Sequence, residues 1–203
     1  MRQNNIDTEK VSEKAFRDLK YYQSTLEYPE DIYITNNDYK IFKKDPVLIE
    51  FSKSISGYEF SELDAITQYI KHNVVSKILS DEFPEISNDL LGIGMIEMKH
   101  FDELCNFFLN FDLNLMANSK NCLEIKTSAN VKENLEIALE GEFKTIEQYK
   151  NIQNMFDDSN YSIEFSNYFN DFLNKLIKDE ETHVRILRKH ISKLKNYIEN
   201  LTH

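Results

Sequence analysis

The sequence is poor in the residues that interrupt helices. Its 203 residues include only four glycines and three prolines, far below average usage. A fold with many short strands needs both residue types at its tight turns, so this composition disfavours an all-β protein. The 41% of hydrophobic residues can build one sizeable core but hardly two. We therefore predict an all-α chain with one main domain.

Cysteine and long apolar runs are also scarce. Cys105 and Cys122 form no Cys-x-x-Cys pair, so neither a disulfide framework nor a zinc knuckle is indicated. We expect Cys105 to be a reduced thiol in the core. No apolar run approaches the roughly 20 residues of a membrane span, and the first ten residues lack the apolar segment of a signal peptide. These features predict a cytoplasmic protein without a membrane partner.

Positive charge is in deficit. Lysine and arginine number 24 against 35 acidic residues, and the formal net charge is −11. Nucleic acids and anionic membranes both require clustered positive charge on their partners, so we expect neither. An excess of carboxylates leaves metal cations as plausible ligands.

The sequence does contain a Glu-x-x-His pair, and it occurs twice. Glu97 and His100 stand in GIGMIEMKHFDEL, and Glu180 and His183 stand in IKDEETHVRIL. Residues three apart share one helix face, with their Cβ atoms about 5–6 Å apart. The carboxylate and the imidazole of each pair can therefore hold one ion.

Two further glutamates have matching surroundings. Glu62 and Glu142 are each followed by a small residue at the third position and by a tyrosine at the seventh, Tyr69 and Tyr149 respectively. Seven residues return to the same helix face. Each tyrosine is thus placed either to donate a hydrogen bond to a ligand carboxylate or to fill the core. The matching order in the two halves of the chain indicates a degenerate internal repeat.

Apolar periodicity predicts four long helices. Asp45-Pro46 supplies the cap and the first residue of the first one, which we expect to run unbroken to about residue 79 with Glu62 near its middle. The other three are expected over about 84–111, 130–156 and 163–201. Residues 112–129 lack clear periodicity and, when extended, are long enough to cross a bundle. Residues 46–203 are thus predicted to form two helical hairpins joined by a crossover.

Residues 1–45 form an N-terminal extension in this scheme. We expect a short amphipathic helix within residues 1–20. Residues 21–42 are aromatic and irregular, with Pro29 and Asn36-Asn37 as helix breakers. They would either strap their own bundle or cover a neighbouring subunit, and both alternatives stay open.

The order Glu, Glu-x-x-His, Glu, Glu-x-x-His resembles that of the ferritin-like superfamily of di-iron and di-manganese carboxylate proteins. Within that superfamily, the sequence most resembles the rubrerythrin-type and manganese-catalase-like members. The resemblance covers roughly residues 46–201. It implies a four-helix bundle that binds two Fe or two Mn ions, with Glu97 and Glu180 bridging them. It further implies these remaining ligands: Glu62 and Glu142, one on each ion, and His100 and His183.

Elementary electrostatics agrees with that implication. Four carboxylates facing a core of low dielectric constant cannot stand unpaired, and two divalent cations would neutralise them. One imidazole per ion favours Fe or Mn over Ca or Mg, which prefer shells made of oxygen alone. The alternative is that the motif residues are solvated charges on helix faces, which are common in a chain with 35 acidic residues.

The resemblance implies an oxidoreductase that acts on hydrogen peroxide or dioxygen, with an external electron donor if the reaction needs one. The sequence departs from the two named members in three ways. The paired cysteines of a rubredoxin-like domain are missing, and Leu139 and Thr145 occupy the positions where a further glutamate would be expected. Gly141 occupies the position of an arginine that is typical of manganese catalases. Peroxide removal is the first expectation, and ferroxidase or iron storage the second. The third is a non-enzymatic coat or shell protein. A homo-oligomer, a dimer or larger, is expected.

Other candidate residues are weaker. His72 and His190 lie further along faces that look inward, and we expect core or surface histidines rather than a third metal site. Gly92, Gly94 and Gly141 either allow helices to approach closely or are simply tolerated.

Overall fold

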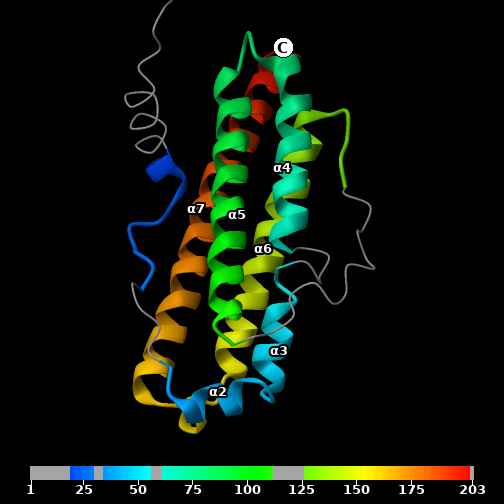
Figure 1. Cartoon of the computed structure of the whole chain (residues 1–203). Coiled ribbons are helices and arrows are strands. Elements are labelled where there is room, and N and C mark those ends of the chain that lie inside the picture. The colour runs from blue at the N-terminus through cyan, green and yellow to red at the C-terminus, as the bar shows by residue number, and fades with distance from the viewer. Residues whose placement is uncertain (1–18, 30–33, 56–60, 112–125, 202–203) are drawn as a thin grey trace, which may run out of the picture.

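Four long helices lie side by side in the computed structural model, which describes residues 19–29, 34–55, 61–111 and 126–201 (Figure 1). They are α4 (Glu62–Ser76), α5 (Pro84–Leu109), α6 (Val131–Met155) and α7 (Ile163–Leu201). α4 packs chiefly on α5, and α6 on α7. No strand occurs within the described ranges. The predicted all-α four-helix bundle is confirmed.

The direction of the helices gives the connection between the two hairpins. In Figure 1, α5 and α6 run the same way, so the end of α5 and the start of α6 lie at opposite ends of the bundle. α4 and α6 consequently run antiparallel to each other. Residues 112–125 of the predicted crossover lie outside the described residues, as does the amphipathic helix predicted within residues 1–20.

Local sequence signals explain where two of the helices begin. Pro84 occupies the first turn of α5, where its missing N–H is not needed. The side chain of Asn130 accepts hydrogen bonds from the backbone N–H groups of Lys132 and Glu133 at the start of α6. The predicted bounds of α5, α6 and α7 therefore agree with the structure to within two residues.

The first predicted helix, in contrast, is broken. Asp45 caps a short α3 (Pro46–Ser52), and Ser61 caps the separate α4. The N–H of Glu62 donates to the carbonyl of Ser54 at 3.0 Å, a span of eight residues where a helix spans four. The prediction of an unbroken helix was wrong, because the apolar periodicity concealed the start signal at Ser61. Glu62 lies in the first turn of α4 rather than in its middle.

An aromatic cluster closes one end of the bundle. Beside α3 lies α2 (Asn36–Phe42), whose Phe42 is fully buried together with Phe51 and Phe111. Asp38 of α2 accepts hydrogen bonds from the N–H and the hydroxyl of Ser162, at 2.8 and 2.7 Å. Because Ser162 immediately precedes α7, this carboxylate ties α2 to the second hairpin.

A strap, residues 19–29, crosses α5 and α7 (Figure 1). It begins with the short helix η1 (Lys20–Tyr22). The Tyr22 hydroxyl donates to Asp89 at 3.0 Å, and the backbone N–H of Ser24 donates to Asp179 at 2.5 Å. The ring of Tyr22 lies over Gly92, where a Cβ atom would come within 2.2 Å of it. Of the two alternatives left open, the described part of the extension packs on its own chain.

Among the described residues, no helix is both long enough and apolar enough to span a bilayer.

Candidate metal centre

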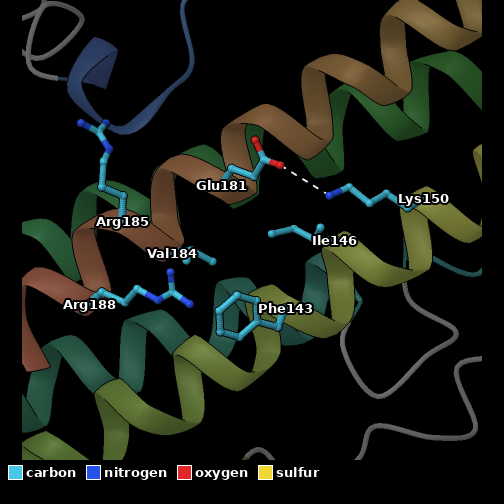
Figure 2. Close-up of a pocket in the computed structure, with 7 residues that line it drawn as sticks. All are labelled: Phe143, Ile146, Lys150, Glu181, Val184, Arg185 and Arg188. Carbon is cyan, nitrogen blue, oxygen red and sulfur yellow. Dashed lines mark hydrogen bonds and ion pairs between the residues drawn. The ribbon is translucent and has the colours of Figure 1, made fainter.

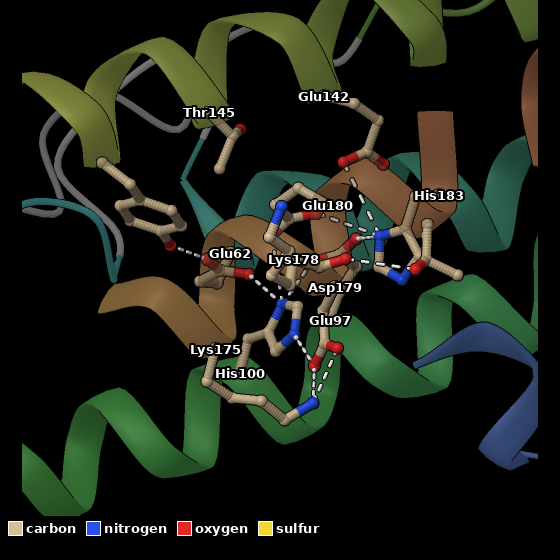
Figure 3. A network of polar contacts seen from close by, with 12 residues as sticks. Glu62, Glu97, His100, Glu142, Thr145, Lys175, Lys178, Asp179, Glu180 and His183 are labelled. Atoms are coloured by element: carbon tan, nitrogen blue, oxygen red, sulfur yellow. Dashed lines mark hydrogen bonds and ion pairs between the residues drawn. The ribbon is translucent and has the colours of Figure 1, made fainter. Parts of the chain in front are cut away.

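Six side chains converge in the middle of the bundle (Figure 3). α4 contributes Glu62, α5 contributes Glu97 and His100, α6 contributes Glu142, and α7 contributes Glu180 and His183. Their relative exposure is between 0 and 5%. The alternative that these groups are solvated surface charges is therefore wrong. The buried cluster contains every residue predicted as a ligand.

The six residues form two overlapping groups of four. One group contains Glu62 and His100, the other contains Glu142 and His183, and both share Glu97 and Glu180. Within each group, one ligand atom per residue lies within 4.8 Å of all the others. Because Glu97 and Glu180 belong to both groups, they occupy the place of bridging carboxylates. The two imidazole rings lie 5.9 Å apart between centroids.

Both imidazoles direct the same nitrogen inward. Nδ1 of His100 lies 3.3 Å from Glu97, 3.2 Å from Glu180 and 3.6 Å from Glu62. Nδ1 of His183 lies 3.0 Å from Glu97, 2.9 Å from Glu180 and 3.6 Å from Glu142. The two halves of the centre thus have matching distances. This is the local symmetry that the internal repeat predicts.

The two tyrosines contact carboxylates of the opposite half. The Tyr69 hydroxyl donates to Oε1 of Glu142, and the Tyr149 hydroxyl donates to Oε1 of Glu62. Seven residues advance about 10.5 Å along a helix, which carries each tyrosine away from the glutamate of its own helix. Since α4 and α6 are antiparallel neighbours, each ring reaches the glutamate across the bundle. Both alternatives from the sequence are observed, since each tyrosine fills the core and also donates a hydrogen bond to a carboxylate.

Burial and mutual repulsion set the protonation of the metal-free centre. Burial raises the pKa of Glu62 to about 8 and holds the pKa of Glu142 well above its usual range. Burial acts the same way on Glu97 and Glu180, but the nearby histidines outweigh it and lower both pKa values. The surrounding anionic groups likewise outweigh burial and raise the pKa of His100 and of His183. Protons thus balance the charge when no metal is bound.

A buried ion pair supports one of the histidines from outside the centre. Nε2 of His100 lies 3.3 Å from a carboxylate oxygen of Asp179, and Lys175 lies 2.6 Å from both oxygens of the same carboxylate. Burial tends to raise the pKa of Asp179, but the bonds from His100 and Lys175 bring it to about 2. Sequence reasoning missed this pair. Its only signal is an aspartate next to Glu180 with a lysine one turn before it.

His72 and His190 belong to the core. Both His72 and His190 are fully buried. Nε2 of His72 lies 3.2 Å from the carbonyl of Lys126, and Nε2 of His190 lies 2.6 Å from Asp89. Neither joins a third group of potential ligands within the described ranges. Of the two positions expected for them, core or surface, the structure shows the core.

The residues of the centre fit two transition-metal ions. Three buried carboxylate oxygens, Oε2 of Glu62, Oε1 of Glu97 and Oε1 of Glu180, accept no hydrogen bond within the described part of the chain. A histidine Nδ1 atom lies near each of them, but a buried acceptor without a hydrogen bond costs about 1–3 kcal/mol and calls for an explanation. Each belongs to a group of three carboxylates and one imidazole, a donor set that suits Fe or Mn.

Figure 2 shows a pocket formed by side chains of the bundle. It measures about 460 Å³ and lies between α6 and α7. Its lining residues are Phe143, Ile146, Lys150, Glu181, Val184, Arg185 and Arg188. None of the six converging residues lines it, so the pocket is not part of the centre.

Comparison with known proteins identifies the family. A family model described as the ferritin-like domain matches residues 61–197, from the cap of α4 almost to the end of α7. The chain belongs to the ferritin-like family. The match covers all six converging residues of this ferritin-like chain, whereas the strap and α3 precede it.

Solved structures agree on the fold. The ferritin-like chain is similar to Rhodobacter capsulatus bacterioferritin, with 23% identity and a TM-score of 0.59 over 74% of this chain and 86% of that one. It is also similar to Mycobacterium tuberculosis bacterioferritin BfrA, with 23% identity and a TM-score of 0.61 over 77% and 91%. The Rhodobacter structure is described as having a metal-free dinuclear site and a haem iron. A search of curated proteins found no match.

Proposed function

We propose that this chain is a ferroxidase of the ferritin-like family, which binds two Fe(II) ions and passes their electrons to dioxygen or peroxide. The observation that carries this proposal is the pair of overlapping ligand groups, each with one imidazole and with two carboxylates in common. Peroxide removal was our first expectation. The likeness to bacterioferritins favours the ferroxidase or iron-storage alternative instead, and peroxide then serves as an oxidant.

In this proposal the first iron position consists of Glu62, Glu97, His100 and Glu180. The second consists of Glu97, Glu142, Glu180 and His183. Two bound ions together supply two electrons to the oxidant. Four carboxylates balance two divalent cations, so binding exchanges protons for metal without burying net charge. Both iron and manganese accept this ligand set, and the bacterioferritin likeness favours iron.

The residues of the chain have distinct roles in this scheme. Glu97 and Glu180 can each hold one ion or both, because each faces the two histidines at about 3 Å. Tyr69 donates a hydrogen bond to one oxygen of Glu142, and Tyr149 donates one to an oxygen of Glu62. The other oxygen of each carboxylate is left to bind an ion. The aromatic cluster at one end of the bundle keeps bulk water from that side.

The test starts with elemental analysis of the purified protein and of protein reconstituted with Fe(II) without oxygen. We expect two iron ions per chain. Oxidation of further Fe(II) on addition of dioxygen or peroxide, followed by the absorbance of ferric iron, would establish turnover. Glu97→Ala and Glu180→Ala should lose both loading and oxidation. The matched control is Glu181→Ala, which changes the neighbouring half-exposed glutamate.

Other outcomes would contradict the proposal. Full loading in Glu97→Ala would mean that the ligands lie elsewhere. Continuous peroxide consumption without net oxidation of added Fe(II) would return the chain to peroxide removal. Two bound ions that never react would favour the structural, non-enzymatic alternative.

We further propose that the chain acts in the cytoplasm as a homo-oligomer, a dimer or larger, with residues 1–45 as an extension of the 46–203 bundle. The observation that supports an oligomer is a row of exposed apolar side chains that runs from α4 into the short helix η2 (Lys77–Leu79). Ile70, Val74 and Ile78 are 49, 61 and 76% exposed, and contiguous exposed apolar surface favours association. Sedimentation of the protein and of Val74→Asp tests this, since a monomer in both would contradict it.

A further inference from the structure

The two proposed metal positions differ in what supports their histidines. Behind His100, Nε2 donates to Asp179 at 3.3 Å. The same carboxylate is held by Lys175 at 2.6 Å and by the backbone N–H of Ser24 at 2.5 Å. Asp179 and Lys175 are at most 2% exposed. A buried chain of polar contacts therefore runs from the strap to the ring of His100.

The matching place behind His183 has no such support. Nε2 of His183 is buried and has no hydrogen-bond partner among the described residues. The internal repeat explains the difference, because Glu97 corresponds to Glu180. The residue before Glu97 is Ile96, which is 1% exposed, whereas the residue before Glu180 is Asp179. An apolar side chain thus stands where the other half has its carboxylate.

This difference matters for a histidine that binds metal through Nδ1. Its Nε2–H then points away from the ion, and an acceptor there orients the ring and makes it a stronger ligand. Loss of such an acceptor typically weakens metal affinity about 10- to 100-fold. Lys175 neutralises Asp179, so the support behind His100 adds no net charge to the centre. The charge balance of the six ligands is therefore unaffected.

The strap completes this arrangement. The ring of Tyr28 packs against Phe172 at 5.7 Å and lies 5.0 Å from the ammonium group of Lys175. The hydroxyl of Ser24 also lies 3.3 Å from that ammonium group. The strap therefore covers the Asp179–Lys175 pair, and Ser24 makes one hydrogen bond with each member of the pair.

We propose that the strap and the Asp179–Lys175 pair make the two positions unequal. The position with His100 binds the first ion tightly, and the position with His183 binds the second ion weakly and exchanges it. Asp179, Lys175 and Ser24 are positioning residues in this scheme, since they act through His100. The inference rests on the proposed two-ion centre and adds an order of filling to it.

Titration of the metal-free full-length protein with Co(II) tests the inference, with heat and visible absorbance as readouts. Two neighbouring cations repel each other, so two binding steps alone would not identify the positions. The single-site variants identify them. The tight step is binding of Co(II) at the position with His100, and the weak step is binding at the position with His183. His183→Asn should therefore keep the tight step, whereas His100→Asn should retain only a weak one.

Asp179→Asn should then weaken the tight step about 10- to 100-fold and leave the weak step nearly unchanged. The matched control is Asp171→Asn, an exposed aspartate on the same helix. Ser24→Pro removes the backbone N–H that Asp179 accepts and should weaken the tight step as well. Ser24→Ala keeps that N–H and loses only the hydroxyl contact with Lys175, so it should weaken the tight step less than Ser24→Pro does. Because Ser24 lies outside the helices, this pair keeps the test valid if Asp179→Asn fails to fold.

Equal affinities in His100→Asn and His183→Asn would overturn the inference, and so would an equal effect of Asp179→Asn on both steps. Either result would leave the two-ion centre standing. Failure of the unmodified protein to bind two Co(II) ions would instead contradict the proposed function itself.

Discussion

Protonation of individual residues links metal binding to pH. In the metal-free protein, burial raises the pKa of Glu62 to about 8 and also raises that of Glu142, while nearby anionic groups raise those of His100 and His183. All four therefore bind protons near neutral pH, and two ions must displace up to about four protons. Affinity should rise with pH between about 6 and 8. Calorimetry in buffers of different ionisation enthalpy counts the released protons.

An affinity that stays constant over this range would contradict the protonated state of the metal-free centre. Glu97→Ala provides the control, because a chain that no longer binds metal should release no protons at all.

Tyr69 gives a second test at the scale of one residue. Tyr69→Phe keeps the ring but leaves Oε1 of buried Glu142 without its donor. An unsatisfied buried acceptor costs about 1–3 kcal/mol, so the free energy of unfolding of the metal-free protein should fall by that amount. Urea denaturation measures it. Tyr21→Phe, at a residue that is 46% exposed, should change it little, and equal stability of both variants would contradict the crossed hydrogen bond.

Residue-level prediction worked where one helix contains the whole pattern. The Glu-x-x-His spacing could be recognised because both members share one helix face. The order of the motifs along the chain then indicated the ferritin-like resemblance. The partner of Tyr69 could not be predicted, because it depends on the antiparallel packing of α4 on α6. The role of Asp179 was missed for the same reason, since its contact with His100 comes from α5 and its contact with Ser24 comes from the strap.

At the scale of elements, Asp38 connects α2 to α7. Its carboxylate accepts four hydrogen bonds from the N–H and hydroxyl groups of Thr35 and Ser162, at 2.7 to 3.0 Å. Hydrogen bonds to a charged group contribute about 1.5–3 kcal/mol, so Asp38→Ala should destabilise the protein by at least about 2 kcal/mol. Denaturation with urea measures this. Asp171→Ala, an exposed change on α7, should have almost no effect.

The same carboxylate predicts a dependence of stability on pH. Burial opposes its ionisation, but the bonds from Ser162 and Thr35 prevail and lower the pKa of Asp38 in the folded protein. Its contribution is therefore present above the pKa of the unfolded chain, about 4, and is lost as pH falls through the lower folded value. The stability difference between the unmodified protein and Asp38→Ala should shrink below about pH 4.

The strap offers a third test at this scale. Gly92→Ala places a Cβ atom 2.2 Å from the ring of Tyr22, and such overpacking costs about 1–3 kcal/mol. Alanine in a helix gains up to about 1 kcal/mol over glycine. Net destabilisation, with faster proteolysis near residue 22, is therefore expected if the strap is bound there. A gain in stability would mean that the strap leaves at little cost. Leu91→Ala is the exposed control.

Prediction of elements succeeded where the end signals are local. Pro84 and Asn130 mark helix starts within a few residues of sequence, so α5 and α6 could be bounded. The break before α4 was missed because the apolar pattern continues on both sides of Ser61. Whether the extension packs on its own bundle depends on contacts more than 60 residues apart in sequence, such as Tyr22 with Asp89.

At the scale of the whole molecule, the fold and the centre stabilise each other. The four helices are held together by apolar packing at both ends, with the buried ionisable cluster between two hydrophobic clusters. Without metal, this middle layer contains buried carboxylate oxygens that accept no hydrogen bond. It also contains carboxyl and imidazole groups whose pKa values are raised, so that they bind protons. The bundle is thus weakest where the proposed ions would bind, and metal binding becomes part of folding stability.

Removal of metal should accordingly lower the melting temperature at pH 7. A ligand at 100 times its dissociation constant stabilises a protein by about 2.7 kcal/mol, and one kcal/mol corresponds to about 2–4 °C for a chain of this size. Reconstitution with Fe(II) or Co(II) should therefore raise the melting temperature by roughly 5–10 °C. Glu97→Ala should show no such rise. If stripped protein melted no lower than loaded protein, the ions would not be bound within the core of the bundle.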